Sequence, residues 1–177
     1  MDFTISGNIY DTLIREMPDN RSEFREGLAT EWTLSEDGTE LLFTIRDGVK
    51  FHDGSDLTVD DVVFSLQWDL EQAPNAAAQP VIKSIEAVGD NQVKVTCNYA
   101  YKPLINLFAT PGFGIFSKAF YEQCEADGTN FLRVECGTGP YILDEWVSGS
   151  SLTLHANDEW WGGEPEIKNV TFEVAQD

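Results

Sequence analysis

The spacing of apolar residues changes along this chain, and that change limits the folds it can adopt. Near the start, Ile5, Ile9 and Leu13 recur every four residues, which predicts an amphipathic helix that ends at Pro18. Over residues 32–45 the period falls to two around a polar turn, which predicts an antiparallel hairpin. Helical and strand patterns then follow one another without regular β-α-β alternation. The sequence therefore predicts an α+β fold with mixed, mainly antiparallel sheets and flanking helices.

The strongest helix signal in the chain begins after Thr58. Val59, Val62 and Leu66 lie on one apolar stripe, and the Thr58 hydroxyl can cap the free amides of the first turn. The other predicted elements are, in chain order, a hairpin over residues 82–99, a short helix ending at Pro111, a helix opened by Ser117, a hairpin over residues 141–157 and a last strand over residues 170–174.

The balance of charge disfavours one broad class of partners. The chain has 11 Lys and Arg against 31 Asp and Glu, a formal net charge of −20. Because contacts to phosphate need Lys and Arg, we expect no binding to nucleic acid or to an anionic membrane surface. No apolar run reaches the roughly 18–20 residues of a membrane span, and the first residues lack the pattern of a signal peptide. The chain itself is expected to be soluble.

Cysteine and histidine are too few and too scattered to indicate a site. Three cysteines leave at least one unpaired, and we expect small buried side chains, with a disulfide between Cys124 and Cys136 as the alternative. There is no C-x-x-C, no P-loop, no G-x-S-x-G and no H-E-x-x-H, and only two histidines. We expect no catalytic residue, no cofactor and no metal.

Residues 43–68 hold the one stretch that resembles an active site, with a histidine and four acids close together. His52 and Asp53 are sequence neighbours whose side chains diverge, so they do not automatically form a relay. Asp60 and Asp61 stand at the positive end of a helix dipole, where acids are stabilising. We interpret the acids as turn and capping residues; a hydrolase with an acid pair is the alternative.

Four segments of the sequence carry a family resemblance. They are "IYDTLI", "GLATEWTLSEDGTELLFTIRDGVKFHDGSDLTVDDVVFSL", "GTGPYILDEWV" and "NDEWWGGEP", and they follow one another over residues 9–174. Together they resemble the extracytoplasmic solute-binding proteins of ABC importers, family 5, the oligopeptide, dipeptide and nickel-binding type. The resemblance implies part of a bilobal, periplasmic-binding-protein-like fold (class II, cluster C). It also implies that residues 43–68 are scaffold in the first lobe.

The resemblance implies a chain roughly three times this length. We therefore expect residues 1–116 to form the small domain of the first lobe and residues 117–177 part of its large domain, with the second lobe absent. The family's ionic clamps on peptide termini, an Asp and an Arg, come mostly from that lobe, so this part alone should bind weakly. Glu135 and Cys136 are a local departure, since the family usually has Pro and an aliphatic residue there.

The function that the resemblance implies is solute capture for transport. The protein would be the substrate-binding component of an ABC transporter for peptide uptake, closing its lobes on the solute and delivering it to the permease subunits. It would act outside the cytoplasm, in the periplasm or on the outer face of the membrane, held by a lipid anchor that lies outside this chain. A nickel-binding or oligosaccharide-binding receptor of the same fold and a surface adhesion module are the alternatives.

Ligand-facing positions are expected by resemblance in two loops, residues 75–79 and 110–114. Small side chains in the first loop leave room, and free backbone groups can pair with an extended peptide. The predicted ligand-binding residues are Asn75, Ala78, Gln79, Thr110 and Phe113. The neighbouring Trp160 and Trp161 suggest a stacking platform for a sugar, but we interpret them as packing residues in a turn.

Overall fold

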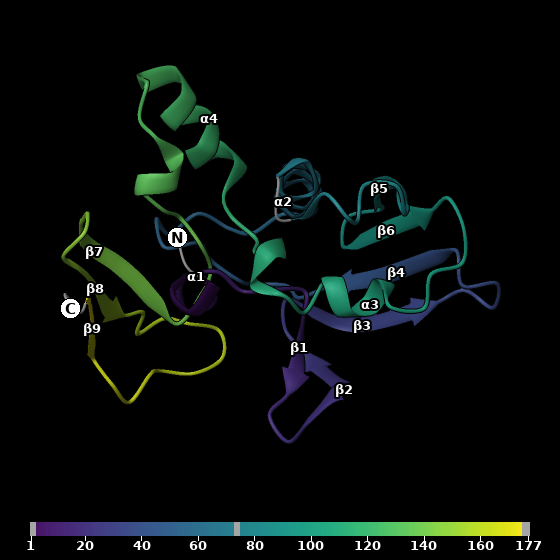
Figure 1. The fold of residues 1–177 in the computed structure, drawn as a ribbon, viewed down its shortest axis with the longest axis horizontal. Coiled ribbons are helices and arrows are strands. Elements are labelled where there is room, and N and C mark those ends of the chain that lie inside the picture. Colours follow the sequence, from purple (N-terminus) through teal and green to yellow (C-terminus); the bar gives the residue numbers. More distant parts are fainter. Residues whose placement is uncertain (1–2, 73–74, 175–177) are drawn as a thin grey trace.

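The computed structural model describes residues 3–72 and 75–174, and its strands form three antiparallel sheets (Figure 1). The helices are α1 (Phe3–Ile9), α2 (Val59–Glu71), α3 (Leu104–Leu107) and α4 (Lys118–Asp127), with 3₁₀ turns at Pro111–Phe113 and Phe131–Arg133. The strands are β1 (Ile14–Met17), β2 (Asn20–Glu26), β3 (Ala29–Leu34), β4 (Glu40–Ile45), β5 (Ile82–Val88), β6 (Gln92–Cys97), β7 (Tyr141–Val147), β8 (Ser151–Ala156) and β9 (Asn169–Glu173).

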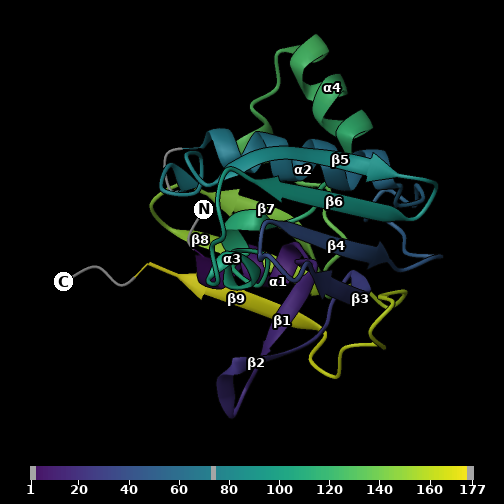
Figure 2. The same ribbon diagram turned by 90° about the vertical axis from the view of Figure 1, so that its right-hand side faces the viewer.

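The largest sheet has the order β3-β4-β6-β5 and carries the main core. Leu41, Phe43 and Ile45 alternate on one face of β4 and are buried, which confirms the period-two prediction. Helix α2 covers this sheet beside β5 and β6, as Figure 2 shows, and buries Val62 and Leu66 completely. The two predicted hairpins of this sheet are therefore confirmed, although β6 ends at Cys97 and not at residue 99.

A capping box fixes the start of α2. The Thr58 hydroxyl accepts a hydrogen bond from the Asp61 amide at 3.3 Å, and the Asp61 carboxylate accepts one from the Thr58 amide at 3.0 Å. The second carboxylate oxygen of Asp61 accepts a hydrogen bond from the Lys118 amide at 3.0 Å. The predicted capping role of Asp61 is confirmed, and the same side chain joins the first turns of α2 and α4.

The first helix is shorter than predicted. It ends at Ile9, and the chain then runs extended into strand β1, which pairs with β2 in a hairpin that the sequence analysis missed. The amides of Leu28 and Ala29 bond to the carbonyls of Thr12 and Leu13, and these long-range bonds replace helical ones. Leu13 is buried from an extended segment, so its spacing from Ile9 imitates a helical stripe.

The third sheet, β7-β8-β9, packs against α1 although the two are far apart in the sequence (Figure 1). Ile9, Leu152 and Leu154 form the buried centre of this second core. The predicted β7–β8 hairpin and final strand are confirmed. The division into residues 1–116 and 117–177 stays a prediction, but α1 lies with the sheet formed near the other end of the chain.

A third, aromatic core lies under α4. Ser117 caps this helix as predicted, and Cys124 is buried beside Phe116 and Phe131. All three cysteines are free and buried, so the structure bears out small buried side chains and not the alternative of a Cys124–Cys136 disulfide. None of the helices described in residues 3–72 and 75–174 is long and apolar enough to cross a membrane.

Removing the hydroxyl of Thr58 tests the capping box. In Thr58→Ala the Asp61 amide loses its acceptor, so we expect the free energy of unfolding to fall by about 1–2 kcal/mol. Urea denaturation followed by circular dichroism measures the loss. Thr129→Ala is the matched control, because Thr129 is exposed and its side chain makes no hydrogen bond within the described part of the chain. Equal losses in the two variants would contradict the role given to the cap.

Candidate functional site

A pocket of about 300 Å³ lies beside the C-terminal half of α2. Its wall is formed by the end of α1, by α2 and the loop after it, and by the segments at residues 111–116 and 131–132. The lining residues are Ser6, Tyr10, Trp68, Asp69, Gln72, Asn75, Pro111, Gly112, Gly114, Phe116, Phe131 and Leu132. Most of this wall is apolar, as is typical of a site for a small molecule.

Packed aromatic rings form the rigid side of the pocket. The ring centroids of Phe116 and Phe131 are 4.8 Å apart, and Trp68 meets Phe116 edge to face at 5.4 Å. Such pairs stabilise the wall beyond the apolar area that they bury. The pocket is therefore shaped by the same residues that form the core under α4.

Asn75 joins the two loops that the sequence analysis singled out. Its side-chain amide nitrogen donates to the backbone carbonyl of Asp69 at 2.8 Å and to that of Gly112 at 2.6 Å. Residues 75–79 and 110–114 thus meet at this pocket, although more than one element separates them in the chain. Both hydrogen bonds of this side chain use the nitrogen.

The other four predicted ligand-binding residues do not line this pocket. Ala78 and Phe113 are 4% and 1% exposed and belong to the main core. Gln79 and Thr110 are exposed, and their side chains bond to the backbone carbonyls of Leu70 and Leu107. A role in solute binding stays a prediction for all five residues, Asn75 included.

Asp69 is the pocket residue that the sequence analysis missed. It is 8% exposed, and its Oδ2 atom is buried without a hydrogen-bond partner in the described structure. Burial raises the pKa of this carboxyl to about 9. The sequence does contain a signal for Asp69: it follows Val62 and Leu66 on the buried face of α2, where an acidic side chain is rare unless it has a partner.

His52 does not act with Asp53. Its Nδ1 lies 3.0 Å from the carboxylate of Glu135 and its Nε2 lies 3.0 Å from the Gly139 carbonyl, while Asp53 closes its own turn by accepting from the Ser55 amide. Burial lowers the pKa of His52, but the hydrogen bond and charge of Glu135 raise it more, so the net pKa lies above its ordinary value. Both neighbours are acceptors, which favours a protonated ring that donates from both nitrogens.

The sequence analysis treats Glu135 only as a local departure from the family pattern, but the structure gives this residue a larger role. Its side chain is 2% exposed, and besides His52 it accepts hydrogen bonds from the amides of Gly137 at 3.1 Å and Leu143 at 2.9 Å. The pair therefore ties the loop after β4 to the segment that leads into β7.

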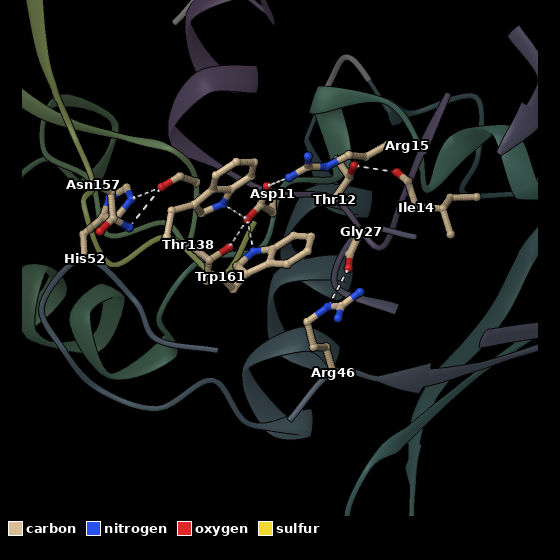
Figure 3. A network of polar contacts seen from close by, with 12 residues as sticks. Asp11, Thr12, Ile14, Arg15, Gly27, Arg46, His52, Thr138, Asn157 and Trp161 are labelled. Atoms are coloured by element: carbon tan, nitrogen blue, oxygen red, sulfur yellow. Dashed lines mark hydrogen bonds and ion pairs between the residues drawn. The ribbon is translucent and has the colours of Figure 1, made fainter. Parts of the chain in front are cut away.

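A second polar cluster surrounds the buried carboxylate of Asp11, drawn in Figure 3. This carboxylate accepts hydrogen bonds from Thr138 Oγ1 at 3.1 Å, from Trp160 Nε1 at 3.1 Å and from Trp161 Nε1 at 2.6 Å, and it pairs with Arg15. The indoles are tied into the fold through these bonds, and Trp161 also packs against the main core, which supports the interpretation of the two tryptophans as structural residues.

Cations cover the faces of the same two rings. The Arg15 guanidinium lies 5.0 Å from the centroids of both Trp160 and Trp161, and the Arg46 guanidinium lies 4.5 Å from that of Trp161. A sugar would have to displace these arginines in order to stack there. Within residues 3–72 and 75–174, no group of three or more His, Cys, Asp or Glu side chains is arranged to hold a metal ion.

Comparison with known proteins places most of the chain in one family. Residues 23–177 match the model of a family described as bacterial extracellular solute-binding proteins, family 5 Middle. The probable D,D-dipeptide-binding periplasmic protein DdpA of Escherichia coli (strain K12) is 29% identical over 180 residues, which cover 98% of this chain and 35% of that protein. The chain spans about a third of the length of the curated relatives it matches.

Solved structures share the fold of nearly the whole chain. HbpA2 from Haemophilus parasuis matches with a TM-score of 0.85 and 30% identity, over 97% of this chain and 38% of that one. The ABC transporter-associated periplasmic binding protein DppA from Helicobacter pylori, solved in complex with the peptide STSA, matches with a TM-score of 0.86 and 27% identity, over 96% of this chain and 37% of that one.

Replacing Asp69 by Asn should make the protein more stable, and increasingly so as the pH rises. The folded state keeps a proton on Asp69 up to about pH 9, whereas the unfolded chain releases it near 3.8, so the free energy of unfolding falls between these values. An asparagine amide at this position carries no such penalty, and at pH 7 we expect a gain on the order of 2–3 kcal/mol. Thermal and urea unfolding at about pH 4, 5.5, 7 and 8.5 measure it.

The matched control for this prediction is Glu71→Gln, an exposed acid on the same helix. It should change stability by less than about 0.5 kcal/mol at any of these pH values. A stability difference between Asp69→Asn and the wild type that does not depend on pH would show that Asp69 is not held neutral in the folded state.

Replacing Asp11 by Asn should destabilise the protein severely. An asparagine side chain has only one acceptor oxygen, and its NH₂ group would point a donor at the indole and hydroxyl donors. We therefore expect a loss of about 3–5 kcal/mol in the free energy of unfolding. Trp161→Phe removes one donor and should cost about 1–2 kcal/mol. Asp158→Asn, which breaks only an exposed pair with Lys168, is the control and should cost under about 1 kcal/mol. Chemical denaturation measures the free energy of unfolding of the three variants. A loss for Asp11→Asn as small as that of the control would contradict the role assigned to this carboxylate.

Proposed function

Because the chain belongs to the bacterial extracellular solute-binding proteins of family 5, we propose that it is the first-lobe part of the substrate-binding component of an ABC transporter for peptide uptake. Its α+β architecture with mainly antiparallel sheets is part of the bilobal periplasmic-binding-protein fold. The observation that carries the proposal is the likeness of 96% of the chain to a periplasmic binding protein solved with a bound peptide.

The pocket beside α2 is the part of the chain that we assign to the solute. It is concave, mostly apolar, and bordered by the two loops that Asn75 holds together. Several backbone amides of those loops are bonded within their own turns, and the remaining backbone groups would pair with an extended peptide in the manner of an added strand. Ala78 and Phe113 would support the loops from the core, while Asn75, Gln79 and Thr110 would stand at the solute's edge.

Capture in such a receptor depends on two lobes that close around the solute. The chain provides one wall, and the rest of the receptor would provide the opposite wall together with the groups that bind the peptide termini. We therefore propose that this part alone binds weakly. The complete protein would act outside the cytoplasm, held to the membrane by a lipid anchor, and would present its closed form to the permease subunits. No reaction is proposed, since the family is one of binding proteins.

Thermal unfolding of two proteins tests this function. The product of the full open reading frame that encodes the chain should gain several degrees in Tm with a mixture of di- and tripeptides, because a ligand that binds only the folded state stabilises it. Residues 1–177 alone should gain none. Free amino acids, oligosaccharides and nickel chloride are the comparison solutes.

Two results would contradict the proposal. If peptides leave the Tm of the full protein unchanged while a sugar or nickel raises it, the solute class is wrong. If residues 1–177 alone are stabilised by several degrees, the opposite wall is not needed for binding.

A further inference from the structure

Among the buried side chains of residues 3–72 and 75–174, the Asp69 carboxyl is the one with an unsatisfied atom. Its Oδ2 atom is buried without a hydrogen-bond partner in the described structure, in a residue that is only 8% exposed and that lines the pocket. Burying a polar atom without a partner costs free energy, so such atoms in native proteins usually have an explanation. A ligand that enters the pocket is one explanation, because the residue lies at its wall.

The side chains nearest to Asp69 along the chain are already used elsewhere. The amide nitrogen of Gln72 donates to the Trp68 carbonyl at 3.0 Å, and that of Asn75 donates to two backbone carbonyls. These are the amide side chains in the pocket wall. The wall also contains the hydroxyls of Ser6 and Tyr10 and the indole of Trp68, and none of them bonds to Oδ2 in the described structure. A solute in the pocket can therefore supply the missing donor.

The described part of the pocket wall also contains no positively charged side chain. Among its lining residues only Tyr10 and Asp69 can ionise, and none is Lys, Arg or His. Burial, together with the charges of Glu135 and other acidic groups, raises the pKa of Tyr10 well above its ordinary value, so this phenol stays neutral. Neither α2 nor the segments at 111–116 and 131–132 adds another titratable side chain to the wall, so any charge in it belongs to Asp69.

We propose that Asp69 makes this pocket selective for a solute that carries a protonated amine or guanidinium group, which donates a hydrogen bond to Oδ2. The inference rests on the proposed function and names the chemical class of its solute. It assigns to Asp69 the part of a specificity-determining residue. A solute with an anionic group at this position would meet a carboxyl and no compensating cation.

Three other features of the structure favour such a cation. Trp68, Phe116 and Phe131 place aromatic rings in the wall, and a cation over a ring face is stabilised. The net charge of −20 attracts cationic solutes over long distances. Because burial keeps Asp69 protonated in the empty pocket, a bound cation would ionise it and expel one proton.

Paired tripeptides measure the selectivity. The probes are Ala-Lys-Ala and Ala-norleucine-Ala, each with a free and with an acetylated amino terminus, bound to the full open reading frame product in a calorimeter. We expect the wild type to prefer the lysine member of each pair, with the free or the acetylated amino terminus, by about tenfold or more. Asp69→Asn should bind charged and neutral members equally, and Glu71→Gln should keep the wild-type preference.

Proton release provides a second readout that a merely structural role would not change. Titrations at about pH 7 in two buffers of different ionisation enthalpy should show up to one proton released per cationic peptide bound to the wild type. Asp69→Asn should release none. A trimethyllysine peptide, which is charged but has no N–H, should bind more weakly than the lysine peptide.

The outcomes separate this inference from the proposed function. If the wild type binds the peptides without regard to charge, or if Asp69→Asn keeps the preference, the cation site is overturned while the receptor function stands. If Asp69→Asn lowers the Tm of the unliganded full protein and leaves the preference unchanged, the partner of Asp69 is a basic residue of the receptor itself, and the inference is overturned. If no peptide binds, both fail.

Discussion

The carboxylate of Asp11 accepts four donors that come from three separate parts of the chain, and the position of the pocket depends on it. It holds the residues after α1 to Thr138 and to the turn that contains Trp160 and Trp161. A buried carboxylate is tolerated only when its lone pairs are satisfied, so this one orders every segment that supplies a donor. Tyr10, its neighbour, thereby reaches the pocket wall at a fixed place.

Close backbone packing supports the same junction. The Gly139 amide bonds to the Ile9 carbonyl at 2.9 Å, and a Cβ atom at Gly139 would lie 2.5 Å from that oxygen. At Gly137 a Cβ would lie 2.2 Å from it. Both glycines of the "GTGPY" segment are therefore required by the contact with the end of α1, and the buried pair of His52 and Glu135 holds this segment from its other side.

Local signals were enough to predict most of the fold, and long-range contacts account for what was missed. Thr58 and Ser117 were recognised as helix caps because a cap is defined within four residues. Leu13 was assigned to a helix because its burial arises from backbone pairing with a distant strand, which spacing does not reveal. The apolar spacing of α2 does not single out Asp69, because a hydrophobic period is defined by its apolar members; that nothing in the described structure satisfies Oδ2 is visible only in three dimensions.

The packing of α1 against β7–β9 has a consequence for the order of events during synthesis. Ile9 leaves the ribosome long before Leu152 and Leu154, the residues that bury it. Since chains generally fold from the N-terminus as they emerge, the four-stranded sheet and α2 can assemble before the sheet that buries Ile9 has been made. Until the last sheet is made, Ile9 lacks the side chains of Leu152 and Leu154 that bury it, so this second core is the last of the hydrophobic clusters that can be completed.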